Sequence, residues 1–152
     1  RQLPNWPQLE VEPIFVEKII PLASPEFIRT HALHEPADLM RVPLIRSNVS
    51  VVQWTDWFDK FGDGLHPERM GLRFDRAMMS LDAAVQKLGV ALESTSIGHS
   101  LIDSGKLQPV FEEHMCMEVQ VHHLVYPPRN ASRPEVKHFV EWLRREALGR
   151  SS

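Results

Sequence analysis

Short apolar runs alternate along the chain with stretches that have the period of an amphipathic helix. Apolar and polar residues alternate over 9–16, and 18–23 is a short, mostly apolar run, so both predict strands. Pro13 places the first of these strands at a sheet edge or a crossover. Ser24 followed by Pro25 is typical of a capped helix start, and a short helix is expected there.

Apolar residues spaced three and four apart predict two helices in the middle of the chain. The face of the first comprises Trp54, Trp57, Phe58 and Phe61. The face of the second comprises Met78, Leu81, Val85 and Leu88. Gly62 and Gly89 are the expected ends of these helices, and Asp75 is the expected cap of the second.

The remaining segments complete an alternation of strands and helices. Short strands are predicted at 43–47, 71–74, 90–92 and 107–111, a longer one at 119–126, a helical turn at 36–40 and a short helix at 97–102. Ser132 and Glu135 form a capping box around Pro134, which opens a final amphipathic helix. This alternation predicts α/β layers with a largely parallel sheet.

Composition and charge narrow the class of protein. A chain of 152 residues with 43% hydrophobic and 24% charged residues is typical of a globular protein with one core, at most split into two lobes. The formal charge of −3 argues against nucleic-acid contact by this segment, since DNA-binding surfaces are basic. The single cysteine, Cys116, rules out an internal disulfide and fits the reducing cytoplasm.

Candidate ligand-binding residues follow three predicted strands, at the corners where strand ends meet helix starts and backbone N–H groups point outward. They are Arg46, Ser47 and Asn48, then Asp75, Arg76 and Met78, and finally Glu93 and Ser94. Arg46 is either a clamp for a carboxylate or phosphate or a member of an ordinary ion pair. Asp75 is a helix cap or a ligand contact, and Ser94 either binds ligand or satisfies local backbone.

Three further patterns have both a functional and a structural interpretation. Trp54, Trp57 and Phe58 are better explained as core than as an aromatic pocket wall. Within the last strand, only one of the neighbours His122 and His123 can face a cleft, and His122 is the candidate. Histidine and cysteine spacing completes no metal site, and no nucleophile elbow, phosphate loop or dinucleotide turn is present, so no catalytic residue, metal or cofactor is expected.

Seven segments in order resemble the effector-binding domain of LysR-type transcription regulators, in particular the subgroup of the glycine-cleavage and β-lactamase regulators. The matching segments are Pro21-Leu22-Ala23-Ser24-Pro25, Pro36-Ala37-Asp38-Leu39 with Pro43-Leu44-Ile45-Arg46, Trp54-Thr55-Asp56-Trp57-Phe58, Gly71-Leu72-Arg73-Phe74-Asp75, Leu88-Gly89-Val90-Ala91-Leu92, Leu124-Val125-Tyr126-Pro127, and the stretch from Arg133-Pro134 to Trp142-Leu143. Each segment alone is a weak signal, but together they cover nearly the whole chain.

The resemblance implies an α/β fold like that of periplasmic binding proteins, with two lobes and a ligand cleft between them. Residues of about 23–118 would form the second lobe, and 1–22 with 119–148 would form part of an incomplete first lobe. A complete member carries a DNA-binding domain ahead of this segment, so the chain is expected to be truncated at its N-terminus.

The function that the resemblance implies is the sensing of a small polar or anionic effector in a cytoplasmic homo-oligomer, a dimer or tetramer. DNA would be bound only through the absent domain, and no membrane is involved. The alternative is a solute-binding protein of a transport system with the same lobed fold. A small α/β enzyme is a third reading, disfavoured by the missing catalytic motifs.

Overall fold

The computed structural model describes residues 6, 8–67 and 71–149. The chain divides into two compact units: one runs from Glu17 to Glu118, and the other combines the residues up to Val16 with those from Val119 onward. Two long strands, β1 (Glu10–Ala23) and β6 (Met117–Tyr126), contribute residues to both units. None of the described helices is long and apolar enough to cross a lipid bilayer.

The sheet of the 17–118 unit is mixed. Three strands, β2 (Leu44–Ser47), β3 (Arg73–Phe74) and β4 (Val90–Ser94), run parallel, with β2 between the other two. The full order is β3-β2-β4-β1-β5, and β6 also pairs with β1. Because β1 runs antiparallel to both β4 and β5 (Gln108–Pro109), the prediction of a largely parallel sheet is wrong outside the β3-β2-β4 part.

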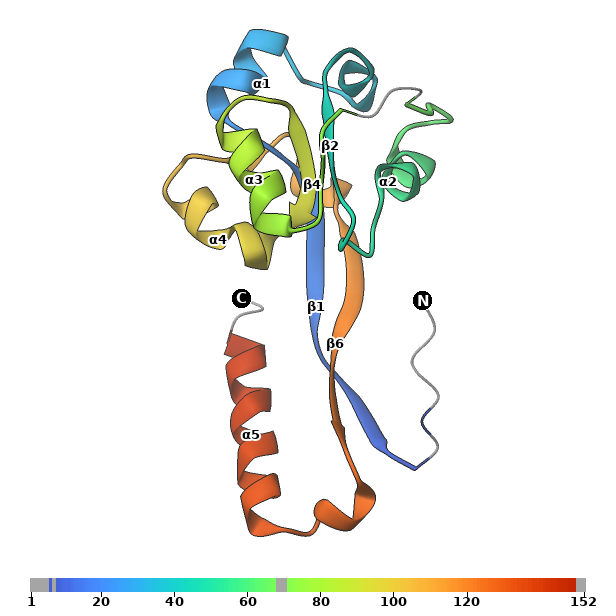
Figure 1. The fold of residues 1–152 in the computed structure, drawn as a ribbon, viewed down its shortest axis with the longest axis vertical. Coiled ribbons are helices and arrows are strands. Elements are labelled where there is room, and N and C mark those ends of the chain that lie inside the picture. Colours follow the sequence, from blue (N-terminus) through green and yellow to red (C-terminus); the bar gives the residue numbers. More distant parts are fainter. Residues whose placement is uncertain (1–5, 7, 68–70, 150–152) are drawn as a thin grey trace. The chain divides into compact units, whose positions relative to one another are not determined.

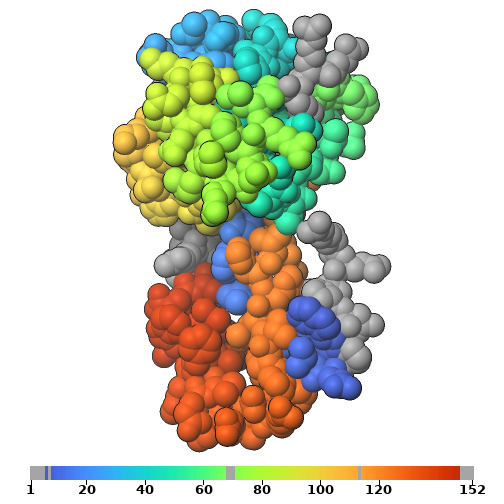
Figure 2. Space-filling model, viewed as in Figure 1, coloured from blue at the N-terminus to red at the C-terminus, as the bar shows by residue number. Residues whose placement is uncertain are grey.

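Short helices flank this sheet. They are α1 (Pro25–His31), α2 (Trp54–Phe61), α3 (Ala77–Val85) and α4 (Thr95–Asp103), with 3₁₀ turns η1 (Pro36–Arg41) and η2 (Glu113–Met115). Helices α3 and α4 lie on one side of β2 and β4, and α2 lies on the other (Figure 1). Side chains of α3 cover much of the face of this unit that is turned toward the viewer in Figure 2. Ser24 caps α1 as predicted, because its side chain accepts a hydrogen bond from the Phe27 N–H.

The aromatic residues of α2 belong to the core. Trp54, Trp57 and Phe58 are at most 1% exposed. The indole N–H of Trp54 donates to the Ile45 carbonyl at 2.9 Å, so the helix is tied to β2. Trp57 donates to the Met115 carbonyl at 3.1 Å. The core interpretation is therefore confirmed over the pocket-wall alternative, since both polar indole groups are satisfied internally.

The second unit contains the first part of β1, most of β6, the turn η3 (Pro128–Asn130) and helix α5 (Pro134–Gly149). Arg144 on α5 forms a two-pronged ion pair with Glu12 on β1, at 2.8 and 2.6 Å. Val140 and Ala147 are buried, whereas Phe139 and Trp142 on the same helix are about half exposed. Helix α5 is thus anchored at its C-terminal half and keeps aromatic side chains on its surface.

Several predicted boundaries were wrong. The strands predicted at 9–16 and 18–23 are one continuous strand, because Pro13 and Pro21 are accommodated within β1. The second predicted helix ends at Val85, which leaves Leu88 exposed beyond it. The predicted strand 107–111 shrinks to two residues. The Lys137 N–H bonds to the Arg133 carbonyl, so Arg133 rather than Ser132 occupies the cap position of α5.

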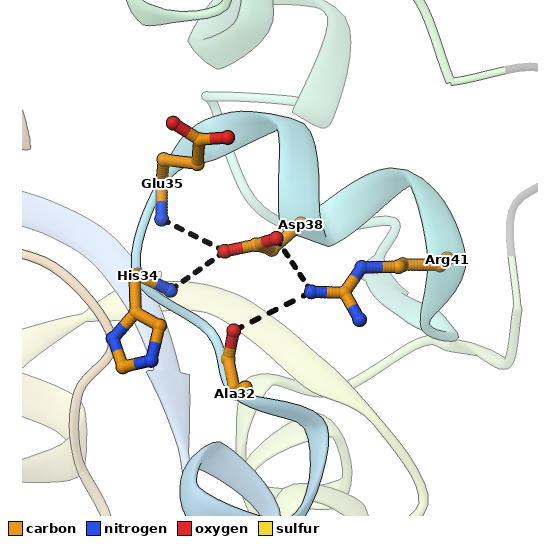
Figure 3. Close-up of polar contacts among 5 residues, drawn as sticks. All are labelled: Ala32, His34, Glu35, Asp38 and Arg41. Atoms are coloured by element: carbon orange, nitrogen blue, oxygen red, sulfur yellow. Dashed lines mark hydrogen bonds and ion pairs between the residues drawn. The ribbon is translucent and has the colours of Figure 1, made fainter.

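A polar cluster fixes the turn η1 beside α1 (Figure 3). The carboxylate of Asp38 accepts the backbone N–H groups of His34 and Glu35 at 2.8 and 3.0 Å and the guanidinium of Arg41 at 2.5 Å. Arg41 also reaches the carbonyl of Ala32 at 3.4 Å. The Arg41 hydrogen bond, followed by the two backbone donors, lowers the pKa of Asp38 from 3.8 to about 2.

This pKa predicts how the Asp38→Asn substitution changes acid stability. A carboxyl whose folded pKa is depressed stabilises the fold above its unfolded pKa of 3.8, and that stabilisation is lost as the pH falls toward about 2. The wild type should therefore unfold at higher urea concentration than Asp38→Asn at neutral pH, and the difference should shrink between these two values. The exposed Asp82 provides the control, since Asp82→Asn should follow the wild-type profile. A constant gap between wild type and Asp38→Asn down to pH 2 would contradict this.

Candidate ligand-binding site at the carboxyl edge of the sheet

The parallel strands β2, β3 and β4 end side by side at one edge of the sheet. Arg46 is aligned with Arg73 on β3, and Ile45 with Ala91 on β4. Each strand then leads into a helix, so three helix N-termini follow the same edge. The register therefore brings together the three predicted corners, 46–48, 75–78 and 93–94, although they are far apart in the sequence.

Arg46 lies at this edge without an ionic partner among the described residues. Its backbone N–H donates to the Leu72 carbonyl at 2.9 Å, which holds it in the β2–β3 pairing. The residue is half-buried, and its Nε atom is buried with no hydrogen-bond partner in the part of the chain that the structure describes. The ion-pair alternative considered from the sequence is thus not observed in the described part of the chain. A guanidinium that is partly desolvated and unpaired is suited to a carboxylate or phosphate.

Asn48 and Asp75 join the corners that follow β2 and β3. The side-chain amide of Asn48 donates to the Asp75 carboxylate at 2.6 Å, and its backbone N–H donates to the Phe74 carbonyl at 2.9 Å. Asp75 does not cap α3 as predicted. Arg76 is the N-cap, and its side chain makes no capping hydrogen bond. Asp75 is instead held by Asn48 across the two strands, and such a pairing leaves no trace in local sequence.

Ser94 is engaged in local contacts at the start of α4. Its hydroxyl oxygen accepts the backbone N–H groups of Ser96 and Ile97 at 3.1 and 3.4 Å. The same hydroxyl donates to the carboxylate of Glu17 on β1. The local capping role weighed from the sequence is therefore observed, and contact of Ser94 with a ligand stays a prediction.

Ser47 and Glu93 lie beneath the solvent-facing layer of the edge. Both residues are 3% exposed, and parallel alignment of β2 with β4 places them on the same face of the sheet. Burial raises the pKa of the Glu93 carboxyl, and the hydroxyls of Ser80 and Ser47 and the backbone of Ser94 oppose this only in part. Ser47 and Glu93 therefore lie below the surface of this edge of the sheet.

His122 belongs to the other compact unit. Its ring stacks on that of Phe15, with centroids 4.6 Å apart and planes 23° apart. Its assignment to the ligand site stays a prediction.

Exposed apolar side chains accompany the polar corners. Val49 is 60% exposed in the loop after β2, and Met78 and Ile97 are each 45% exposed in the first turns of α3 and α4. Arg76, the cap residue between β3 and α3, is also exposed. The edge therefore offers both polar donors and apolar contact surface, which is the mixture typical of small-molecule sites.

Two buried polar residues at this edge, Glu17 and Ser80, were missed by the sequence reasoning. Glu17 carried a signal, because strand alternation places it on the same side of β1 as the buried Ile19. Ser80 carried none, since a serine in the first turn of a helix is commonplace.

Another concavity of the 17–118 unit shares no lining residue with this edge. It has a volume of about 470 Å³ and is lined by Lys18, Lys60, His114, Cys116 and Glu118. No three His, Cys, Asp or Glu side chains of the described residues are grouped so as to hold a metal ion.

Comparison with known proteins identifies a matching family and similar sequences. The family model described as "LysR substrate binding domain" matches residues 1–148. An uncharacterized HTH-type transcriptional regulator, y4mQ of Sinorhizobium fredii, is 37% identical over 145 residues, which cover 93% of this chain and 47% of that protein. The HTH-type transcriptional regulator PerR of Escherichia coli is 36% identical over 135 residues, covering 88% and 44%.

Solved structures show the same fold. The effector domain of the regulator AmpR from Pseudomonas aeruginosa superposes with a TM-score of 0.74 at 27% identity, covering 97% of this chain and 71% of that one. The AmpR effector-binding domain from Citrobacter freundii gives 0.71 at 21% identity, covering 95% and 70%. The chain spans less than half the length of the two curated relatives above. It belongs to the LysR substrate-binding domain family.

Proposed function

We propose that this chain is the effector-sensing domain of a LysR-type transcription regulator and binds a small polar or anionic effector at the carboxyl edge of β2, β3 and β4. The observation that carries the proposal is the parallel register of these strands, which gathers the three predicted corners at the edge where Arg46 has no ionic partner among the described residues. Ligands of open α/β sheets bind at such edges.

The chemistry of the edge favours an anion. Arg46 supplies a fixed fork of donors, and the N-terminus of α3 has backbone N–H groups that the side chain of its N-cap residue, Arg76, does not cap. The helix dipole adds partial positive charge at that end of α3. Val49, Met78 and Ile97 provide apolar contact beside these donors. The effector in this proposal therefore combines a carboxylate or similar polar head with a small apolar part.

Gene regulation is the proposed output of this binding. The relatives named above are transcriptional regulators more than twice as long as the stretch they share with this chain. In this proposal the DNA contact belongs to a helix-turn-helix domain outside the chain, in keeping with the formal charge of −3. The protein acts in the cytoplasm and catalyses no reaction. The relatives favour this function over the alternative of a transport solute-binding protein.

The Arg46→Ala substitution tests the effector site in the complete regulator. Removing a two-pronged charged contact of about 1.5–3 kcal/mol should weaken effector binding roughly 10- to 100-fold. A reporter gene should therefore lose its effector response, while DNA binding in a gel-shift assay stays normal. Arg73→Ala is the matched control, because Arg73 is the exposed neighbour of Arg46 in the β2–β3 register. A normal effector response in Arg46→Ala would make Arg46 a structural residue only.

We also propose that the chain forms a homo-oligomer. Phe139 and Trp142 on α5 are 53% and 47% exposed, and their rings contact each other with centroids 5.8 Å apart. Paired exposed aromatics are typical of the centre of protein interfaces. A symmetric contact would use this one patch on both subunits.

Light scattering of the purified chain checks this expectation. The wild type should have a mass of at least twice 17.5 kDa, and the double substitution Phe139→Ser with Trp142→Ser should reduce it to that of one chain. Glu141→Ser, on an exposed position of the same helix, should leave the mass unchanged. A wild type that is monomeric at 17.5 kDa and folds cooperatively would show the proposal to be wrong.

A further inference from the structure

Three buried polar side chains meet where β2, β4 and α3 come together. Glu93 on β4, Ser47 on β2 and Ser80 on α3 are 3%, 3% and 0% exposed. Glu93 Oε1 and both hydroxyl oxygens are buried, and none has a hydrogen-bond partner of regular geometry among the described residues. The two hydroxyls nevertheless lie close enough to the carboxyl to affect its pKa. The cluster is therefore polar and almost fully buried.

The groups that act on Glu93 are uncharged. Its pKa is raised by burial and lowered in part by the Ser80 hydroxyl, the Ser47 hydroxyl and the backbone of Ser94. The residue aligned with it on β1 is the apolar Ile20. No compensating cation is among these groups, so an ionised carboxylate at this position would be poorly stabilised.

Ionisable residues on the surrounding elements face elsewhere. On β2, Arg46 alternates with Ser47 and so points to the opposite face of the sheet. Lys18 on β1 is exposed, as are Arg76 and Asp82 around the first turns of α3. Glu17 on β1 is buried, but it accepts a hydrogen bond from Ser94 and lies on the opposite face of the sheet from Glu93. On α4, His99 and Asp103 are exposed and pair with each other at 2.7 Å.

We propose that Glu93, Ser47 and Ser80 form a buried proton-binding site whose protonated, uncharged form holds the carboxyl ends of β2 and β4 against α3. The proton comes from solvent and resides on the Glu93 carboxyl, beside the two serine hydroxyls. Loss of the proton leaves a carboxylate with no cationic partner among the described residues in the core and loosens the contact among the three elements. The site thereby makes the geometry of the edge sensitive to pH.

This inference does not depend on the identity of any effector, because the proton is the ligand. It goes beyond the proposed sensing function, and its test uses the chain without effector. A failure of the Arg46 experiment would leave it standing.

Carboxyl ¹³C NMR of the chain across pH gives the direct test. Glu93 should titrate with a midpoint above 4.5, the value of an ordinary glutamate. Because the Ser80 hydroxyl lowers the pKa, Ser80→Ala should move the midpoint further upward. A Glu93 midpoint at or below 4.5 would overturn the proposal, and an unchanged midpoint in Ser80→Ala would remove Ser80 from the site.

Unfolding measured against pH provides the second test. A carboxyl whose folded pKa is raised stabilises the fold at low pH, and this stabilisation is lost as the pH rises from 4.5 through the folded pKa. The wild type should therefore lose stability over that window relative to Glu93→Gln, which stays neutral. Glu118→Gln should keep the wild-type profile. Parallel profiles for wild type and Glu93→Gln would contradict the proposal, and if Glu93→Gln does not fold, the wild-type NMR titration decides.

Discussion

Parallel pairing of β2 with both β3 and β4 is the constraint on which the site depends. The register of β4 is set where it begins, because the Val90 N–H donates to the Pro43 carbonyl at 3.0 Å. Gly89 precedes it with a φ of +154°, and a side chain there would collide with that carbonyl. Glycine thus permits β4 to start in register with β2. A shift along the strands would separate the corners that follow them.

The same register explains why polar residues are buried at this edge. Parallel alignment puts Ser47 and Glu93 on the face covered by α3, where Leu81, Ala83 and Ala84 form the core with Ile45 and Ala91. Arg46, on the opposite face, remains half-buried. A core that only had to be stable would place apolar side chains at positions 47 and 93. Burial of the polar side chains of Ser47 and Glu93 therefore costs stability at this edge.

Local sequence patterns predicted local structure well, but they did not predict the pairings between distant segments. Ser24 and Pro25 begin α1, and the spacing of Trp54, Trp57 and Phe58 describes α2, because capping and helical periodicity act within a few residues. The three corners predicted at strand ends follow neighbouring parallel strands, and their role in ligand binding stays a prediction. The antiparallel course of β1, the Asn48–Asp75 hydrogen bond and the burial of Ser80 depend on contacts between segments far apart, which one sequence does not encode in its periodicity.

The central claim is that ligands of this domain bind at the carboxyl edge of the three parallel strands. Amide chemical shifts of the ¹⁵N-labelled chain, followed while small carboxylates and amino acids are added one by one, test it most directly. For any compound that binds, the account predicts shift changes concentrated at Asn48, at Arg76 to Met78 and in the first turn of α4. The Arg46→Ala substitution should make these shift changes weaker. Changes confined to other surfaces, such as the concavity lined by Lys18, Lys60 and His114 or the exposed face of α5, would contradict it.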